Sequence, residues 1–246
     1  MALTSPPLHV ILNSSLLFFS LALLAISPAV LYLTIHGIRS MDRVWPQGSY
    51  TWFRGPSHDV DTKHQVNLIY EGSSEHMIIA AAAASALAGV VGVAGFFLAG
   101  KIANTSARKP TLFLQIVPSS VSFIVTVIAF IYTQSIFDTD NMRKCDWTQG
   151  YIPDMNFQCT HEQAACGIVG YFTKDTKDSW DTARKWRQTG VICHETQTGR
   201  YLVASLFVAS LLMFGIAVGK FLVEKREMKF SVSADERVER LVAQEQ

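Results

Sequence analysis

The charged residues of this chain are confined to four segments, and the apolar stretches between them contain no charge at all. The 246 residues include 21 Lys and Arg and 20 Asp and Glu, and all of these lie within residues 36–76, 101–110, 138–200 and 220–246. Only 17% of the residues are charged, whereas 49% are hydrophobic. This distribution excludes a soluble enzyme, a disordered chain, a nucleic-acid binder and a coiled coil.

Each charge-free stretch is long enough to cross a bilayer as a helix. About 20 residues at 1.5 Å each span the hydrocarbon core of about 30 Å, and lipid offers backbone groups no other hydrogen-bond partners. The sequence therefore predicts an all-α membrane protein with four transmembrane helices in an antiparallel bundle. The predicted helices are Leu8–Ile35, Met77–Gly100, Thr111–Phe137 and Tyr201–Gly219.

These helices divide the chain into six parts. They are the N-terminus with the first helix (1–35), a first outer loop (36–76), two helices joined by a short loop at 101–110 (77–137), a second outer loop (138–200), the fourth helix (201–219) and a tail (220–246). A cleaved signal peptide is the alternative for the first stretch. Pro28 directly follows the small residues of the cleavage site, which favours an uncleaved anchor.

Basic residues near the helix ends predict which side faces the cytosol. Four spans place both termini and the 101–110 loop on one side. The basic residues beside the membrane there are Lys101, Arg108, Lys109, Lys220, Lys225, Arg226 and Lys229. Because such residues are enriched in cytosolic loops, both termini are expected in the cytosol. The sequence does not distinguish the endoplasmic reticulum from the plasma membrane.

All four cysteines lie in the second outer loop, on the side expected to be oxidising. Cys145, Cys159, Cys166 and Cys193 predict two disulfides, with three pairings open. The two outer loops together are expected to form a small extracytoplasmic region that contains these disulfides. In the first loop, Tyr50–Phe53 and Val66–Tyr70 are β-prone and compatible with a short hairpin.

Small and polar residues predict which helix faces meet protein within the membrane. Asn13 begins a polar stripe on the first helix that continues with Ser20, Ser27 and Thr34. On the second helix, Ser85, Gly89, Gly92 and Gly95 form a stripe of small residues that would let another backbone approach closely. Such stripes serve either a packed bundle or a polar cavity for an apolar ligand. No charged residue lies within a predicted span, which argues against a proton relay or a charged ion pathway.

Several further motifs lie near the predicted helix ends. Trp45, Trp52 and Phe53 are interpreted as aromatic anchors at the interface, with a partner-binding surface as the alternative. A helix is predicted over Asp175–Gln188, with Gly190 as its stop. In the tail, a capping box at Ser233 and Glu236 predicts the start of another helix.

Two clusters contain side chains that could carry chemistry. Cys159, His161, Glu162 and Cys166 form one, and Cys193, His194 and Glu195 form the other. Their spacing matches no tight metal motif, so disulfides beside bystander histidines are the main interpretation, with a metal site or acid–base catalysis as alternatives. The candidate catalytic residues are His161, Glu162, His194, Glu195 and Gln115. No cofactor is predicted.

The layout resembles two families of four-helix membrane proteins. Asn13, the Ala165-Cys166-Gly167 segment and Cys193 resemble the corresponding positions of tetraspanins, although that family carries a double cysteine. The β-prone first loop resembles that of claudins, whose paired cysteines are absent here. In size the chain also resembles small polytopic proteins of fungal biosynthetic gene clusters, which implies secondary metabolite biosynthesis as a cyclase, oxidase or helper.

Two functions are therefore expected from the sequence. The first is a multi-pass scaffold or accessory protein that organises partners through its outer loops and helix faces. The second is a membrane-embedded enzyme or enzyme subunit acting on an apolar metabolite. The expected partners are membrane lipid, a membrane protein or a second copy, and in the second case an apolar small molecule, but not nucleic acid.

Overall fold

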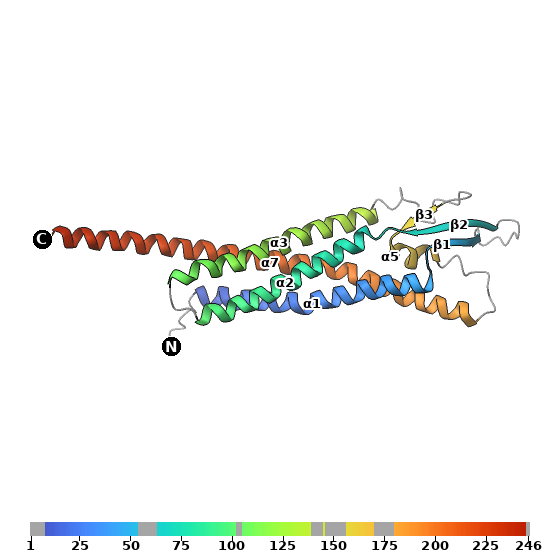
Figure 1. The fold of residues 1–246 in the computed structure, drawn as a ribbon, viewed down its shortest axis with the longest axis horizontal. Coiled ribbons are helices and arrows are strands. Elements are labelled where there is room, and N and C mark those ends of the chain that lie inside the picture. Colours follow the sequence, from blue (N-terminus) through green and yellow to red (C-terminus); the bar gives the residue numbers. More distant parts are fainter. Residues whose placement is uncertain are drawn as a thin grey trace, which may run out of the picture.

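Four long helices lie side by side, and a small region of short elements caps one end of them (Figure 1). The computed structural model describes residues 8–53, 63–101, 105–138, 145, 156–169 and 180–244. The long helices are α1 (Leu8–Val44), α2 (Ser73–Lys101), α3 (Thr105–Asp138) and α7 (Trp180–Gln244). The short elements are β1 (Gly48–Phe53), β2 (Lys63–Tyr70), β3 (Asn156–Cys159), α5 (His161–Gln163) and the π-helix η3 (Ala164–Ile168).

The four predicted apolar helices are confirmed, and all are longer than the charge-free stretches. Each is long and apolar enough to cross a membrane, as a multi-pass membrane protein requires. The largest difference is α7, which continues through Gly190, so the predicted helix stop there is wrong. It also continues without a break past Ser233, so no separate helix begins in the tail. The final turns of α7 extend beyond the other helices (Figure 1).

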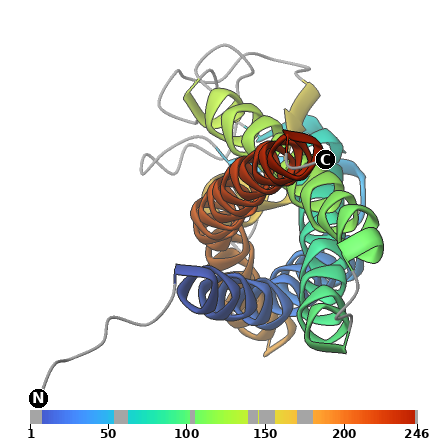
Figure 2. The ribbon, with the colours of Figure 1, turned by 90° about the vertical axis from the view of Figure 1, so that its left-hand side faces the viewer.

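The helices form a ring (Figure 2). In it, α1 packs on α2 and α7, and α3 completes the ring by packing between α2 and α7. Successive helices run in opposite directions, so the amino-terminal end of α1 and the carboxyl-terminal end of α7 lie away from the sheet (Figure 1). Leucines, valines and alanines fill the centre, among them the fully buried Leu16, Leu23 and Leu206. We call these four helices, below the sheet end, the bundle.

Small residues let α1 and α2 approach closely. A Cβ placed on Gly89 would lie 2.9 Å from the Ser20 carbonyl oxygen, and one on Gly92 would overlap the Ser20 side chain. Ser20 and Ser27 are fully buried, whereas Asn13 is half-buried. Close backbone contact of this kind is a general source of helix association in membrane proteins.

Buried hydroxyls and stacked rings join α3 to its neighbours. Ser122 hydrogen-bonds Ser85 of α2 at 3.1 Å, and Thr126 hydrogen-bonds Ser210 of α7 at 2.7 Å. Phe123 stacks on Phe214 with ring centroids 5.3 Å apart. These contacts satisfy each hydroxyl inside an apolar medium.

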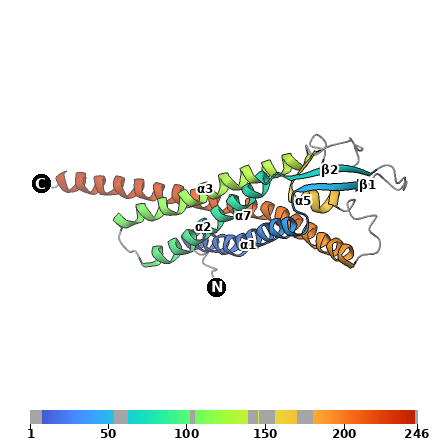
Figure 3. The same ribbon diagram turned by 45° about the vertical axis from the view of Figure 1, so that its right-hand side comes forward.

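The three strands, α5 and η3 form a second unit with the adjoining ends of α1 and α7, which we call the head (Figure 3). The predicted hairpin is confirmed, because β1 and β2 pair antiparallel. The third strand was not predicted. It pairs parallel with β2, placing Cys159 opposite Tyr70. This pairing brings the second outer loop against the first.

The head has its own hydrophobic core. Fully buried Met41 and Leu68 pack there with Phe157, Ile168 and the 5% exposed Trp45. The interpretation of Trp45 as a membrane-interface anchor is therefore wrong: its indole is inside the head and donates a hydrogen bond to Thr189 Oγ1 at 2.9 Å. The side chains of Trp52 and Phe53 lie outside the described residues.

Candidate functional site

Five charged or titratable side chains meet where the head rests on the bundle. Asp42 comes from α1, Glu75 from the start of α2, His161 and Glu162 from α5, and Arg200 from α7. We call this set the polar joint. Three of its members, Glu75, His161 and Glu162, are at least nine-tenths buried. Buried charges are stable only when they are paired and hydrogen-bonded, so their geometry decides what the joint can do.

A local capping motif places His161 at the joint. Thr160 caps α5: its Oγ1 accepts from the Gln163 amide at 3.1 Å, and its own amide donates to Gln163 Oε1 at 2.9 Å. The His161 amide then donates to Glu75 Oε1 at 3.0 Å. The carboxylate at the start of α2 therefore completes the cap of α5, which fixes the head against the bundle.

The His161 ring lies between two carboxylates. Its Nδ1 is 3.3 Å from Glu75 Oε1, and its Nε2 is 3.2 Å from Asp42 Oδ1. The ring stacks on Tyr70, with centroids 4.2 Å apart. Burial lowers the pKa of the imidazole, but the hydrogen bonds and charges of Glu75 and Asp42 outweigh it, so the net direction is upward. Because only imidazolium donates from both nitrogens, this geometry favours the charged form.

Glu162 and Arg200 form the second pair of the joint. Arg200 Nε donates to both Glu162 oxygens, at 3.0 and 3.2 Å, and its Nη1 reaches Gln134 Oε1 of α3 at 3.5 Å. Burial raises the pKa of the Glu162 carboxyl, and Arg200 opposes this only in part, so that the pKa is about 7. Glu162 can therefore gain or lose a proton near neutral pH.

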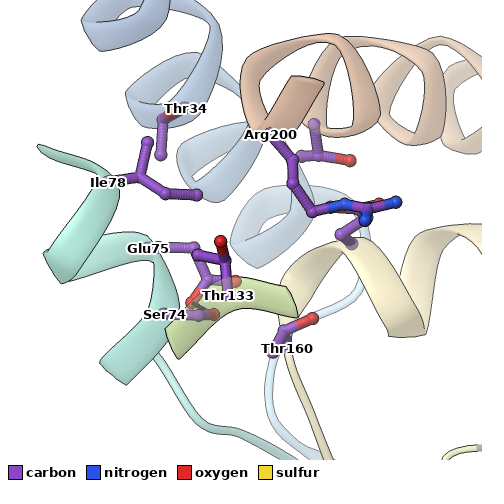
Figure 4. A pocket seen from close by; sticks show the side chains of 9 residues that line it. Thr34, Ser74, Glu75, Ile78, Thr133, Thr160 and Arg200 are labelled. Carbon is purple, nitrogen blue, oxygen red and sulfur yellow. Dashed lines mark hydrogen bonds and ion pairs between the residues drawn. The ribbon is translucent and has the colours of Figure 1, made fainter. Parts of the chain in front are cut away.

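A small cavity lies beside this pair. Figure 4 shows Thr34, Ser74, Glu75, Thr133 and Thr160 converging on it from α1, α2, α3 and the strand end, with Arg200 at one side. Its volume is about 20 Å³. A single water needs at least about 10–15 Å³ measured in this way, so the cavity accommodates about one water and no larger molecule.

The candidate catalytic residues lie in three separate places. His161 and Glu162 belong to the polar joint. His194 is exposed on α7, where it contacts Thr198, and Glu195 pairs with His36 of α1 at 2.8 Å. Gln115 lies toward the other end of the bundle, where its Oε1 accepts from the buried Lys220 at 3.1 Å. The structure therefore brings only two of the five together.

The cysteines form two disulfides, Cys145–Cys159 and Cys166–Cys193. The prediction of two disulfides is confirmed, and these are the two pairs. Cys145–Cys159 joins the first candidate cluster to a cysteine outside both clusters. Cys166–Cys193 joins the first cluster to the second. Among the residues that the structure describes, no group of three His, Cys, Asp or Glu side chains is placed to hold a metal ion. Two histidines of the first outer loop could join either cluster in three dimensions, but His58 lies outside the described residues, as does the side chain of His64.

Asp42, Glu75 and Arg200 were missed by sequence reasoning. Glu75 lies two residues before the second apolar stretch and Arg200 directly before the fourth. The helices extend beyond those stretches, so the candidate membrane spans include Glu75, Arg200 and Lys220. The expectation that the spans are free of charge therefore holds only within the narrower boundaries predicted from the sequence. A charged residue beside an apolar stretch, next to small or hydroxyl residues, is the signal that could have found them.

The outer ends of α1 and α7 enclose a larger groove of about 360 Å³ on the surface of the head. Val44, Val191 and Ile192 give it apolar walls, and the exposed Arg43 and Arg187 stand along it. The His36–Glu195 pair also lines this groove. We call it the α1/α7 groove. Its two exposed guanidinium groups favour an anionic ligand or an acidic protein surface.

Comparison with known proteins gave no relative: no family model, curated protein or solved structure matches the chain.

Proposed function

We propose that this protein is a multi-pass membrane scaffold that organises partners through the head. In this proposal the head faces the extracytoplasmic side and both termini lie in the cytosol. All four cysteines lie in the head or beside it, whereas Lys101, Lys225 and Arg226 lie toward the other end of the helices. This separation matches the positive-inside rule and the confinement of disulfides to oxidising compartments.

The observation that carries the proposal is the contrast between the polar joint and the α1/α7 groove. The titratable groups of the joint bond one another, and the adjoining cavity has about 20 Å³. The groove is about 18 times larger and its arginines are exposed. The joint is therefore suited to holding the head in place, and the groove to contact with a partner.

The groove also has a fixed geometry, which a recognition surface requires. α1 and α7 touch closely at its bundle end: a Cβ on Gly37 would lie 2.5 Å from Thr196 Cγ2, and one on Gly199 would lie 3.2 Å from Thr34 Oγ1. Close contact there leaves the two helices little freedom to move apart. A preformed groove lowers the entropic cost of binding.

Affinity purification in mild detergent, with mass spectrometry of both proteins and small molecules, tests the proposal. The test variant is Arg43→Glu with Arg187→Glu, and the control is Arg39→Glu with Arg184→Glu, which changes the same charge on the same two helices outside the groove. We expect the groove variant to lower recovery of stoichiometric membrane partners at least about tenfold, or about 1.4 kcal/mol. Equal recovery from both variants would overturn the proposal.

A second candidate is an enzyme or enzyme subunit acting on an apolar metabolite. The observation in its favour is Glu162, whose pKa of about 7 lies near the value expected of a general acid or base and which lines a cavity with room for one water but not for the metabolite itself. A retained apolar molecule in the same purification, or a product lost on Glu162→Gln with unchanged protein partners, would favour this function. His161→Ala discriminates less well, because the His161 ring also holds the head through Glu75 and Asp42.

A further inference from the structure

The two disulfides of the head differ in their access to solvent. Cys145 is 3% exposed and Cys159 is fully buried, and both belong to the core of the head. Cys166 is exposed, and Cys193 is half-buried at the edge of that core. A thiol–disulfide exchange requires direct attack on sulfur, so only the second bridge can meet a thiol from solvent without prior unfolding.

A cavity of about 210 Å³ lies directly against Cys166–Cys193. Trp186 and Thr189 of α7 form one wall, and Ala165 and Val169 form another. Gly190 lies on its rim, where an added Cβ would meet nothing within 4 Å. Trp186 lies beside the disulfide, but its side chain is 54% exposed and leaves the bridge open.

We propose that Cys166–Cys193 is a thiol–disulfide exchange site for low-molecular-weight thiols, a property that goes beyond the scaffold function and does not depend on it. The thiolate of one external thiol enters the cavity and attacks Cys166 Sγ. A mixed disulfide forms at Cys166, and Cys193 leaves as a thiolate that takes a proton from water. A second thiol attacks the sulfur of the bound carrier, which releases Cys166. The two cysteines are reduced and the two external thiols are oxidised to one disulfide.

The position of this bridge gives its opening a structural consequence. Cys166 belongs to η3, which directly follows the α5 turn carrying His161 and Glu162, and Cys193 belongs to α7. Opening the bridge removes the disulfide cross-link between η3 and α7. The Glu162–Arg200 pair then remains as a polar link between α5, which precedes η3, and α7.

Differential alkylation of the full chain in detergent tests the proposal. The protein is exposed to reduced glutathione, quenched with an alkylating reagent at intervals, and digested so that each cysteine is quantified by mass spectrometry. We expect Cys166 and Cys193 to become labelled at least about tenfold faster than Cys145 and Cys159, with the glutathione adduct on Cys166. Equal rates, earlier opening of Cys145–Cys159 or an adduct mainly on Cys193 would overturn the proposal.

A matched pair of variants tests the role of the cavity. Gly190→Leu adds a side chain at the rim, whereas the control Val191→Leu enlarges its neighbour, which lines the α1/α7 groove instead. We expect Gly190→Leu to slow opening of Cys166–Cys193 about fivefold or more and the control to leave it unchanged. Equal slowing in both variants would contradict access through the cavity. If Gly190→Leu fails to fold, Trp186→Ala decides, because it widens the cavity and must accelerate the exchange.

Discussion

The bundle and the head are held together by different interactions. Inside the bundle, an aliphatic core is combined with close backbone approaches, hydroxyl pairs such as Ser85–Ser122, stacked phenylalanines and one hydrogen bond from Lys220 to Gln115. The head instead combines an aromatic and aliphatic core with two disulfides and the charged groups of the polar joint.

This difference follows from the surroundings proposed for each region. Lipid is as apolar as a leucine side chain, so helices within it gain from close contact and from satisfied hydroxyls rather than from burial of apolar area. In the proposed orientation the head is exposed to water, where burial of apolar area stabilises, but its core is small, and small extracytoplasmic units commonly depend on disulfides. Each region should therefore be sensitive to a different kind of substitution.

The largest expected effect is the loss of the buried disulfide of the head. Cys145→Ser with Cys159→Ser removes a link across 14 residues, and loops of this size correspond to about 3 kcal/mol of stability. We expect the head to become sensitive to limited proteolysis while the bundle stays resistant. Cleavage of the head and the bundle at the same protease concentration would show that the disulfide does not stabilise the head more than the bundle.

A smaller effect is expected from adding one methyl group between α1 and α2. In Gly89→Ala the new Cβ would lie 2.9 Å from the Ser20 carbonyl oxygen, so a backbone must shift, at a cost of about 1–3 kcal/mol. Gly215→Ala is the control, since its Cβ would meet nothing within 4 Å. Thermal unfolding in detergent should separate the two variants. Equal melting temperatures would contradict the close packing of α1 on α2.

The pH dependence of stability should distinguish the head from the bundle. The pKa values of His161 and Glu162 are both raised in the folded state, the latter to about 7. A raised pKa means that the folded state binds protons more tightly than the unfolded state does. The stabilisation by these protons is present below the pKa of the unfolded state and is lost as pH rises through the pKa of the folded state. The head should therefore be less resistant to proteolysis at pH 8 than at pH 6.

Glu162→Gln is the control for this pH effect. Glutamine resembles the protonated carboxyl and does not titrate, so the variant should show a weaker dependence on pH. A head that is more resistant at pH 8, or an unchanged profile in Glu162→Gln, would contradict the contribution assigned to this group.

The smallest expected effect is at the hydroxyl pair of α2 and α3. A double-mutant cycle with Ser85→Ala and Ser122→Ala should give a coupling of about 0.6 kcal/mol, the usual value for such bonds within membrane proteins. Thermal unfolding of the four proteins of the cycle measures it. A coupling above about 2 kcal/mol would mean that polar bonds, rather than close packing, dominate the bundle.

The sequence predicted the bundle well because its signal is local. A charge-free stretch requires only its own residues to identify a helix, and the β-prone segments at Tyr50–Phe53 and Val66–Tyr70 likewise identify the hairpin. The third strand could not be found in this way, because it pairs with β2 across about 90 residues of sequence. Parallel pairing of this kind depends on the tertiary fold.

The polar joint and the course of α7 also depend on distant contacts. Gly190 was expected to end a helix, but Thr189 accepts from Trp45 and Cys193 is bridged to η3, so the chain on both sides of the glycine is held in place. Tertiary contacts here override local preference. Similarly, His161 was recognised as a candidate, but Glu75 lies 86 residues away in sequence and nothing local connects the two.

Hydrogen exchange of the full chain in lipid nanodiscs tests most directly whether the polar joint stabilises the head independently of the bundle. The comparison is between the natural protein and His161→Ala, which removes the contacts of the imidazole ring with Glu75 and Asp42 and leaves the backbone amide in place. We predict that amides of β3 and η3 exchange about tenfold faster or more in the variant, while those of α3 between Ser119 and Ala129 are unchanged. Equal acceleration in the head and in α3, or none in the head, would contradict the account.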